Sequence, residues 1–231
     1  MPPASLEMNA CSRSSTILVF ARAPIPGRVK TRLAARLGAA GAAEAHRACL
    51  LDAIALADSL PGCACRLLVA GDASAWRDAG LALPAGWETE PQRGRDLGER
   101  LEHGFAESFR RGAQKVIAIG TDTPWMGARR LRTAQGWLDF EEVVLGPSCD
   151  GGYYLIGARR MVPGIFRGIG WGTSTVLGST RRALERGATS YRLLPWDFDL
   201  DRPADLDRAW EMLRQSPQRA PHLTAFLRRG I

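Results

Sequence analysis

Short apolar segments alternate with amphipathic segments along nearly the whole chain, and this alternation limits the fold more than any other feature. The apolar segments have the length of strands, and the amphipathic segments carry apolar residues at helical spacing. Such alternation indicates a largely parallel sheet, because parallel strands need a crossover that a helix usually supplies. We therefore expect an α/β fold with a mostly parallel central sheet sandwiched by helices. The expected strands are residues 16–20, 66–70, 87–90, 115–119, 143–145, 153–156 and 191–194, and the expected helices are residues 41–59, 96–111, 128–138, 175–186 and 203–214.

The length of 231 residues fits one large domain, since no repeat, low-complexity tract or shift in composition marks a boundary. We expect this single domain to cover residues 16–215. Residues 1–15 lack the long apolar stretch of a signal peptide and are expected to form a disordered leader. Residues 216–231 form a basic tail that either packs as a short helix or frays. No apolar run approaches the ~20 residues of a membrane span.

Arginine dominates the charge of the chain, which is +7 at pH 7. The arginines occur as scattered pairs, such as Arg129-Arg130 and Arg181-Arg182, rather than as a dense block with interleaved aromatic residues. This distribution favours an anionic small molecule over nucleic acid as the partner. The five cysteines lack the regular spacing of a disulfide scaffold, which indicates reduced thiols and a cytoplasmic protein.

The segment after the first expected strand, from Arg22 to Leu33, concentrates positive charge and holds one of the two lysines of the chain. Open α/β proteins bind phosphates where a strand ends in a loop and the next helix begins. Arg22, Lys30 and Arg32 would add formal charge to such a site. The alternative is an ordinary solvated loop before a basic helix start.

This segment differs from a P-loop in its backbone chemistry. A P-loop needs glycine directly before the lysine and free backbone N–H groups around the phosphate. Here Val29 precedes Lys30, and Pro24 and Pro26 have no N–H to donate. Side-chain cations rather than a glycine-rich nest are therefore the candidate phosphate ligands.

Asp122 follows directly on the apolar strand expected at residues 115–119. Ligands of open α/β sheets bind at the carboxyl ends of the strands. A carboxylate there, opposite Lys30 and Arg32, suits Mg²⁺ or Mn²⁺, which prefer oxygen ligands. The alternative is a turn residue at a strand end, where Asp is common.

Asp150 precedes Gly151 and Gly152, which can adopt positive φ and let a ligand approach the backbone closely. This arrangement makes Asp150 a candidate catalytic base. Asp-Gly-Gly before aromatic residues is also a good hairpin turn, so the second interpretation is purely structural.

Three aspartates, Asp197, Asp199 and Asp201, alternate with other residues and would share one face of an extended segment. Helix capping is enough to explain Asp201 or Asp205. It does not explain three carboxylates on one face, where mutual repulsion destabilises the fold unless a cation or an arginine intervenes. Asp199 and Asp201 are therefore further candidates for metal binding.

The motifs of the chain fall into six ordered segments, which are Ala23–Leu33, Gln92–Leu101, Gly120–Pro124, Gly146–Gly157, Trp171–Leu177 and Asp199–Leu206. Together they resemble a bacterial family of nucleotide-diphospho-sugar transferases formerly classified as a domain of unknown function, some members of which are named as arsenosugar-type glycosyltransferases. The Lys-x-Arg-Leu loop and the Asp-Gly-Gly motif are also similar to 2-phospholactate guanylyltransferase.

The resemblance implies a GT-A-like fold, which metal-dependent glycosyltransferases share with nucleotidyltransferases. It places Lys30 and Arg32 at nucleotide-phosphate positions, Asp122 at the position of a metal-binding carboxylate, and Asp199 or Asp201 at the second metal position. The chain departs from the nucleotidyltransferase pattern in two places. Its first loop has no Gly-rich triphosphate cradle, and Arg202 replaces the usual Thr of Asp-x-Asp-Thr-Pro.

The expected function is a metal-dependent glycosyltransferase that takes a nucleotide sugar and an unknown small-molecule acceptor, with Asp150 as the base of an inverting reaction. A nucleotidyltransferase that uses a nucleoside triphosphate and releases pyrophosphate is the first alternative. A non-catalytic nucleotide-binding module is the second. The sequence leaves the oligomeric state open.

Overall fold

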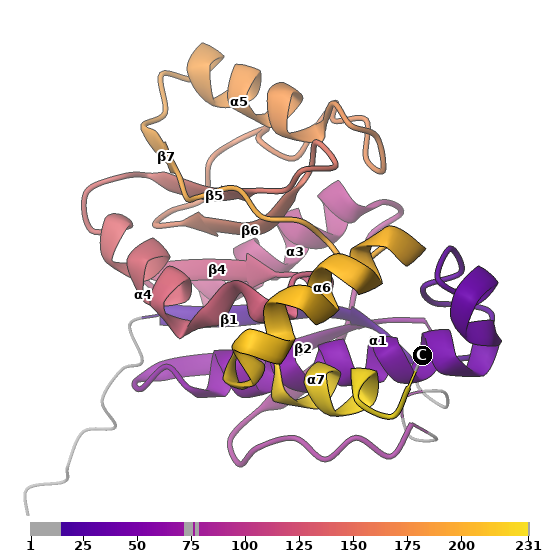
Figure 1. Cartoon of the computed structure of the whole chain (residues 1–231). Coiled ribbons are helices and arrows are strands. Elements are labelled where there is room, and N and C mark those ends of the chain that lie inside the picture. The colour runs from indigo at the N-terminus through magenta and orange to yellow at the C-terminus, as the bar shows by residue number, and fades with distance from the viewer. Residues whose placement is uncertain (1–14, 72–75, 77–78, 231) are drawn as a thin grey trace, which may run out of the picture.

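The computed structural model describes residues 15–71, 76 and 79–230. Within them, a seven-stranded sheet has the order β3-β2-β1-β4-β6-β5-β7, with helices on both faces (Figure 1). The strands are β1 (Ser15–Arg22), β2 (Cys63–Ala70), β3 (Glu88–Pro91), β4 (Lys115–Ile119), β5 (Val143–Pro147), β6 (Tyr153–Ala158) and β7 (Tyr191–Leu193). The helices are α1 (Ala34–Asp58), α3 (Leu97–Arg110), α4 (Gly127–Trp137), α5 (Val176–Arg186), α6 (Pro203–Gln215) and α7 (Pro221–Leu227), with 3₁₀ turns η1 (Pro124–Met126) and η2 (Pro217–Arg219). The expected α/β class is confirmed.

Only β6 runs against its neighbours β4 and β5, whereas the other described strand pairs are parallel. The reason is local, because the tight turn at residues 148–152 connects β5 directly to β6 as a hairpin. The backbone N–H of Ser148 donates to Gly152 O at 3.0 Å, and Gly151 takes φ +92°. Parallel strands could not be joined by so short a connection.

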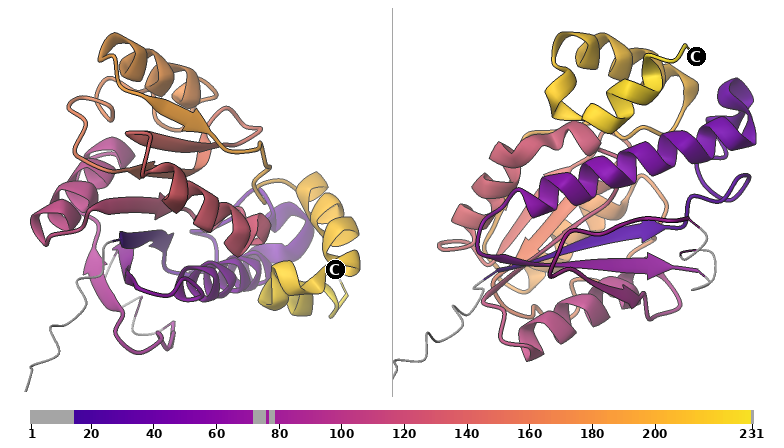
Figure 2. Two further views of the ribbon diagram at one scale, coloured as in Figure 1. Left: turned by 90° about the vertical axis from the view of Figure 1, so that its left-hand side faces the viewer. Right: turned by 90° about the horizontal axis from the view of Figure 1, so that it is seen from below.

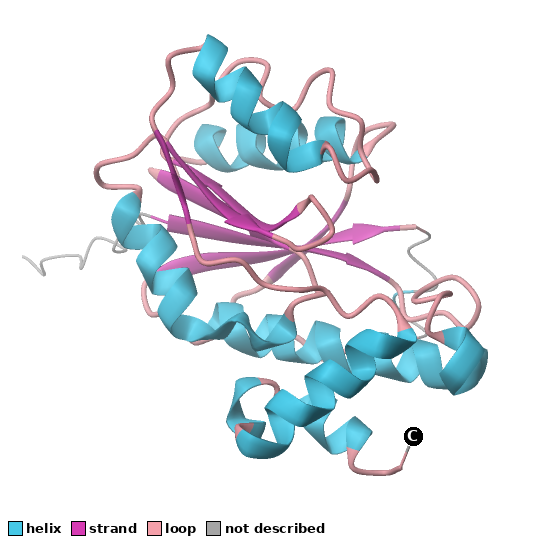
Figure 3. Ribbon diagram, turned by 45° about the horizontal axis from the view of Figure 1, so that its top comes forward, coloured by secondary structure: helices cyan, strands magenta, loops and turns pink. Residues whose placement is uncertain are grey.

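The sheet is covered by different helices on its two faces (Figures 2 and 3). On one face, Ile17 and Val19 of β1 join a core with Leu50 and Ile54 of α1. On the other, Leu18 joins a core with residues of α3 and α5. Alternate residues of a strand point to opposite faces, so an almost continuous apolar run fits a strand buried on both.

Helix α1 begins at Ala34, earlier than the expected start at residue 41. Gly38 interrupts the regular helix with φ +68° and ψ 170°, so the segment is two helical pieces joined at a kink. Glycines near the start of the segment obscured the helical pattern in the sequence.

The C-terminal segment forms η2 and α7, and α7 packs on α1. Asp52 of α1 is only 3% exposed, and its two carboxylate oxygens accept the backbone N–H groups of His222 and Leu223, each at 2.9 Å. Burial raises the pKa of Asp52, and these two donors lower it in part. The carboxylate satisfies backbone groups that the start of α7 would otherwise leave unpaired.

The expected leader, residues 1–15, lies outside the described residues except for Ser15, which begins β1. Over the described ranges, the model contains no helix with both the length and the apolar character needed to cross a bilayer.

Candidate functional site

The candidate site lies beside β1, at the point where the chain stops adding strands on one side of the sheet and starts adding them on the other. From β1 the sheet extends through β2 on one side and through β4 on the other. At such a switch point, the loops after the two central strands diverge and leave a crevice at the carboxyl edge of the sheet. Residues 23–33 follow β1, and residues 120–126 follow β4, so the basic segment and Asp122 meet at this edge.

The loop after β1 is a succession of tight turns. The backbone N–H of Ile25 donates to Ala23 O at 2.8 Å, that of Arg28 to Ile25 O at 3.0 Å, and that of Leu33 to Lys30 O at 2.8 Å. Val29 and Leu33 are 5% and 0% exposed and anchor the loop in the protein. Several backbone N–H groups are thus engaged within the loop itself, while its side chains carry the charge.

Lys30 and Asp122 form an ion pair at the base of the site. Lys30 Nζ lies 2.5 Å from Asp122 Oδ1 and also donates to the carbonyl oxygen of Leu200. The Lys30 side chain is 4% exposed, whereas that of Asp122 is 53% exposed. Lys30 has φ +47°, a conformation that few residues other than glycine adopt. The turn at Lys30 therefore directs the ammonium inward to a carboxylate that remains open to ligands.

The pair is charged at neutral pH. Burial works against the ammonium of Lys30, but the Asp122 carboxylate outweighs it and raises the pKa of Lys30. Desolvation by the protein around the half-exposed Asp122 opposes its ionisation, but the Lys30 ammonium holds the pKa of this carboxyl below its usual value. Asp122 is therefore an anion that a second cation could share.

Asp199 is the second carboxylate of the site. Thr123 Oγ1 donates to its Oδ1 at 2.5 Å, and Ser148 Oγ donates to its Oδ2 at 2.6 Å. Burial raises the pKa of Asp199 to about 6, the two hydroxyl groups lower it in part, and the negative charges of Asp122 and Asp150 raise it further. The carboxylates of Asp122, Asp150 and Asp199 therefore lie close enough to repel one another, and this arrangement favours binding of a cation.

Asp199→Asn is expected to stabilise the ligand-free protein in a pH-dependent manner. The pKa of Asp199 is about 6 in the folded chain, which is higher than in the unfolded chain. Its contribution to the free energy of unfolding is therefore fully present below about pH 4 and is lost as the pH rises through about 6. Asn cannot ionise and can still bond both hydroxyl groups. Urea unfolding should show the variant more stable by about 1–3 kcal/mol at pH 8, with little difference at pH 4. A difference that stays constant with pH would contradict the assignment.

The three alternating aspartates do not act together. Asp197 is buried, where it accepts from Trp125 Nε1 at 3.0 Å and forms an ion pair with Arg130. Asp201 Oδ2 lies 2.5 Å from Arg32 Nη1, in a pair that is about half exposed. The repulsion expected on one shared face is thus relieved by two arginines, and the negative charge of Asp122 acts on Asp199.

Asp150 is exposed at the tip of the β5–β6 hairpin, and its Oδ1 accepts the backbone N–H of Gly152 at 2.8 Å. A Cβ atom at Gly151 would lie 2.1 Å from Ser174 O, so glycine is required for the close approach of these two segments. The hairpin interpretation of Asp-Gly-Gly describes the backbone correctly, and the hairpin presents Asp150 next to Asp199.

Arg22 is the last residue of β1. Its backbone carbonyl oxygen accepts from His46 Nε2 at 3.0 Å, and Arg22 lines a cavity of about 260 Å³ at the carboxyl ends of β1 and β2. Arg28 and Arg100 line the same cavity. The sequence reasoning did not single out these two arginines, although Arg28 belongs to the basic loop and Arg100 to the segment Gln92–Leu101.

Two of three comparisons relate the chain to known proteins. The model of a family described as "uncharacterized protein conserved in bacteria (DUF2064)" matches residues 53–173. No curated protein sequence matches the chain. A crystal structure from Desulfovibrio desulfuricans, of a protein assigned as a nucleotide-diphospho-sugar transferase, is 31% identical, with a TM-score of 0.87 and 94% of each chain covered.

Two more distant structures share the fold. The Rv0371c protein of Mycobacterium tuberculosis, in complex with manganese, is 20% identical with a TM-score of 0.54, over 86% of this chain and 98% of that one. CMP:2-keto-3-deoxy-manno-octonic acid synthetase, in complex with CTP, is 15% identical with a TM-score of 0.50, over 87% of this chain and 99% of that one.

These similarities support a transferase role and show the fold of the nucleotide-diphospho-sugar transferases. The matched region covers more than half of the sequence, and the similarity to the Desulfovibrio protein extends over nearly all of it. The chain therefore belongs to the DUF2064 family of bacterial proteins.

Proposed function

We propose that the chain is a metal-dependent glycosyltransferase that takes a nucleotide sugar as donor. The observation that carries the proposal is the cluster of Lys30, Asp122 and Asp199 at the switch point of the sheet, where a buried cation and two carboxylates with shifted pKa values converge. Such a cluster suits a diphosphate held together with a divalent cation, and the manganese complex of the Mycobacterium protein supports the same kind of ion.

The donor set fits Mg²⁺ or Mn²⁺. Both ions prefer oxygen ligands, which the carboxylates of Asp122 and Asp199 would supply. Among the described residues, no three or more His, Cys, Asp or Glu side chains form a metal-binding cluster. A site with so few protein ligands is typical of Mg²⁺, which keeps several waters and takes further oxygens from the substrate phosphates. When bound, the ion would act as a Lewis acid on the departing diphosphate.

The remaining groups would hold the donor and move the proton. Lys30 and Arg32 neutralise the departing nucleoside diphosphate, and Arg22, Arg28 and Arg100 line the adjacent cavity. In an inverting transfer, an acceptor hydroxyl oxygen bonds to the anomeric carbon as the bond from that carbon to the diphosphate breaks. The hydroxyl proton passes to Asp150, and the diphosphate leaves with the bonding electron pair.

Nucleotidyl transfer is the second candidate, because the CTP-bound synthetase shares the fold. In that reaction the loop after β1 would have to hold a triphosphate. The internal hydrogen bonds of Ile25 and Arg28 occupy their backbone N–H groups, and Pro24 and Pro26 have none, so the loop offers few amides to a triphosphate. This observation favours the diphosphate of a nucleotide sugar.

Phosphorus NMR of the products distinguishes the two reactions. The chain is incubated with Mn²⁺, pooled nucleotide sugars, pooled nucleoside triphosphates and a mixture of hydroxylated acceptors. Sugar transfer releases a nucleoside diphosphate, whereas nucleotidyl transfer releases pyrophosphate. Acceptor-dependent pyrophosphate without nucleoside diphosphate would contradict the proposal.

Lys30→Ala and Arg32→Ala are each expected to weaken nucleotide binding by about 1.5–3 kcal/mol, the range for hydrogen bonds to charged groups. Folding should change little in Arg32→Ala, because Arg32 is 64% exposed, whereas Lys30→Ala removes a buried partner of Asp122 and should also lower the melting temperature. Arg36→Ala is the matched control. Arg36 lies at the start of α1, just after this loop, and pairs with Asp207 of α6 at 2.7 Å. Unaltered affinity by calorimetric titration in both test variants would remove this loop from the site.

A further inference from the structure

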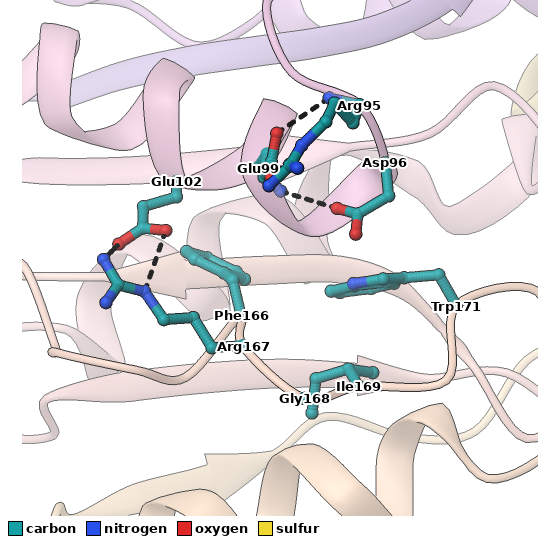
Figure 4. Close-up of a pocket in the computed structure, with 9 residues that line it drawn as sticks. All are labelled: Arg95, Asp96, Glu99, Glu102, Phe166, Arg167, Gly168, Ile169 and Trp171. Atoms are coloured by element: carbon teal, nitrogen blue, oxygen red, sulfur yellow. Dashed lines mark hydrogen bonds and ion pairs between the residues drawn. The ribbon is translucent and has the colours of Figure 1, made fainter.

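A second cavity, of about 500 Å³, lies between the first turns of α3 and the loop that follows β6 (Figure 4). This volume is within the range of small-molecule sites. Two of the six motif segments, Gln92–Leu101 and Trp171–Leu177, meet here, and the phosphate and metal groups described above make no use of these cavity walls. Apart from Arg100, the residues of these two segments have no role in the proposed chemistry, and the cavity brings several of them together.

The aromatic wall of the cavity is held in place by packing. Phe166 lies edge-on to Phe105, with ring centroids 5.4 Å apart, and Trp171 lies edge-on to Tyr153 at 6.2 Å. A Cβ atom at Gly98 of α3 would lie 2.4 Å from both Phe166 O and Trp171 Nε1. Only glycine at this position lets the loop approach α3 so closely. The cavity is thus formed before any ligand binds.

The polar wall offers both hydrogen-bond donors and acceptors. Figure 4 shows the Arg167–Glu102 pair on the side of Phe166 and Asp96 on the side of Trp171. Asp96 Oδ1 accepts the backbone N–H of Glu99 at 2.9 Å, whereas its Oδ2 has no hydrogen-bond partner among the described residues. The lining has three carboxylates and two guanidinium groups, so its net charge does not favour an anionic ligand.

We infer that this cavity binds a neutral polyhydroxylated ring, a sugar, as the acceptor of the transfer. The inference rests on the proposed glycosyltransferase function and names its acceptor class. A sugar ring has an apolar C–H face, which packs on an aromatic side chain such as Trp171, and a rim of hydroxyl groups. Those hydroxyl groups can donate to Asp96 and Glu102 and accept from Arg167.

The loop that lines the cavity also reaches the transfer site. Beyond Trp171 it continues to Ser174, whose carbonyl contacts Gly151, and the backbone N–H of Leu177 donates to Gly151 O at 2.9 Å. Gly151 directly follows Asp150. A ligand on Trp171 is therefore held by the same segment that fixes the turn of the candidate base.

The test is binding of a panel of neutral methyl pyranosides to the full chain, measured by saturation-transfer difference NMR and titration. Trp171→Ala is expected to weaken binding of the best pyranoside at least about tenfold, equivalent to about 1.4 kcal/mol. Trp210→Ala, at a surface position on α6, should leave the affinity within about twofold.

A second variant, Gly98→Ala, adds a single methyl group and should abolish binding. Gly136→Ala on α4 is its control, because a Cβ atom there meets no atom within 4 Å.

Nucleotide binding in the presence of Mn²⁺ should be unchanged in Trp171→Ala, which separates this inference from the proposed function. Failure of every pyranoside to bind, or binding that survives Trp171→Ala, would overturn the inference even if nucleotide sugars are consumed. Displacement of the pyranoside by a nucleotide sugar, but not by the matching nucleoside diphosphate, would assign the cavity to the donor sugar and likewise overturn the acceptor role.

Discussion

Asp150→Asn is expected to lower turnover by about 10²–10⁴, the usual share of general acid–base catalysis, while nucleotide-sugar binding stays within a few-fold. The substitution removes the ability to take up the acceptor proton. It keeps the hairpin, because the amide oxygen of Asn can still accept the Gly152 N–H that Asp150 Oδ1 accepts at 2.8 Å. Steady-state kinetics combined with calorimetric titration measure the two effects separately.

The control for Asp150→Asn is Asp58→Asn. Asp58 Oδ1 accepts Trp87 Nε1 at 2.9 Å near the end of α1, before β2 begins, and so at the edge of the sheet opposite the candidate site. This variant should retain full turnover. A loss of binding that matches the loss of turnover in Asp150→Asn would mean that Asp150 is a metal or ribose ligand. Full activity would leave Asp150 with the hairpin turn as its only role.

Asp122→Asn is expected to abolish the gain in nucleotide binding that Mg²⁺ or Mn²⁺ provides. A neutral amide is a far poorer ligand for a hard cation than a carboxylate is. The measurement is the rise in melting temperature with nucleotide plus metal compared with nucleotide alone. The same rise in the variant and in the unmodified chain would contradict a role of Asp122 in metal binding.

The structure also predicts how Asp122→Asn changes stability without ligand. Lys30 is 4% exposed and pairs with Asp122, so the single variant leaves a buried ammonium without its charged partner and should lower the melting temperature. If repulsion among the carboxylates alone acted, Asp122→Asn would instead raise the melting temperature. The double variant Lys30→Gln with Asp122→Asn removes both charges. It should recover part of the lost stability without recovering the metal effect.

Local sequence patterns predicted most of the secondary structure. The strand at residues 115–119 has the expected bounds, and the helix expected at 203–214 ends one residue later, at Gln215. These elements carry strong local signals, namely an apolar run and a proline at the first helical turn. Helix α1 was predicted less well. The kink at Gly38 depends on the tertiary structure, and the local sequence has no clear pattern that indicates it.

The sequence by itself determined the α/β class and the presence of a cationic loop and three acidic motifs, because strand and helix periodicity and residue chemistry are local properties. Only the tertiary structure decided how these charges pair. Lys30 and Leu200 are separated by 170 residues along the chain, as are Asp52 and His222. Arg130 pairs with Asp197, and Arg32 pairs with Asp201. The charge of Asp122 acts on Asp199. Partner choice among side chains of equal charge depends on distance and burial in the folded chain, and neither quantity can be read from residue spacing.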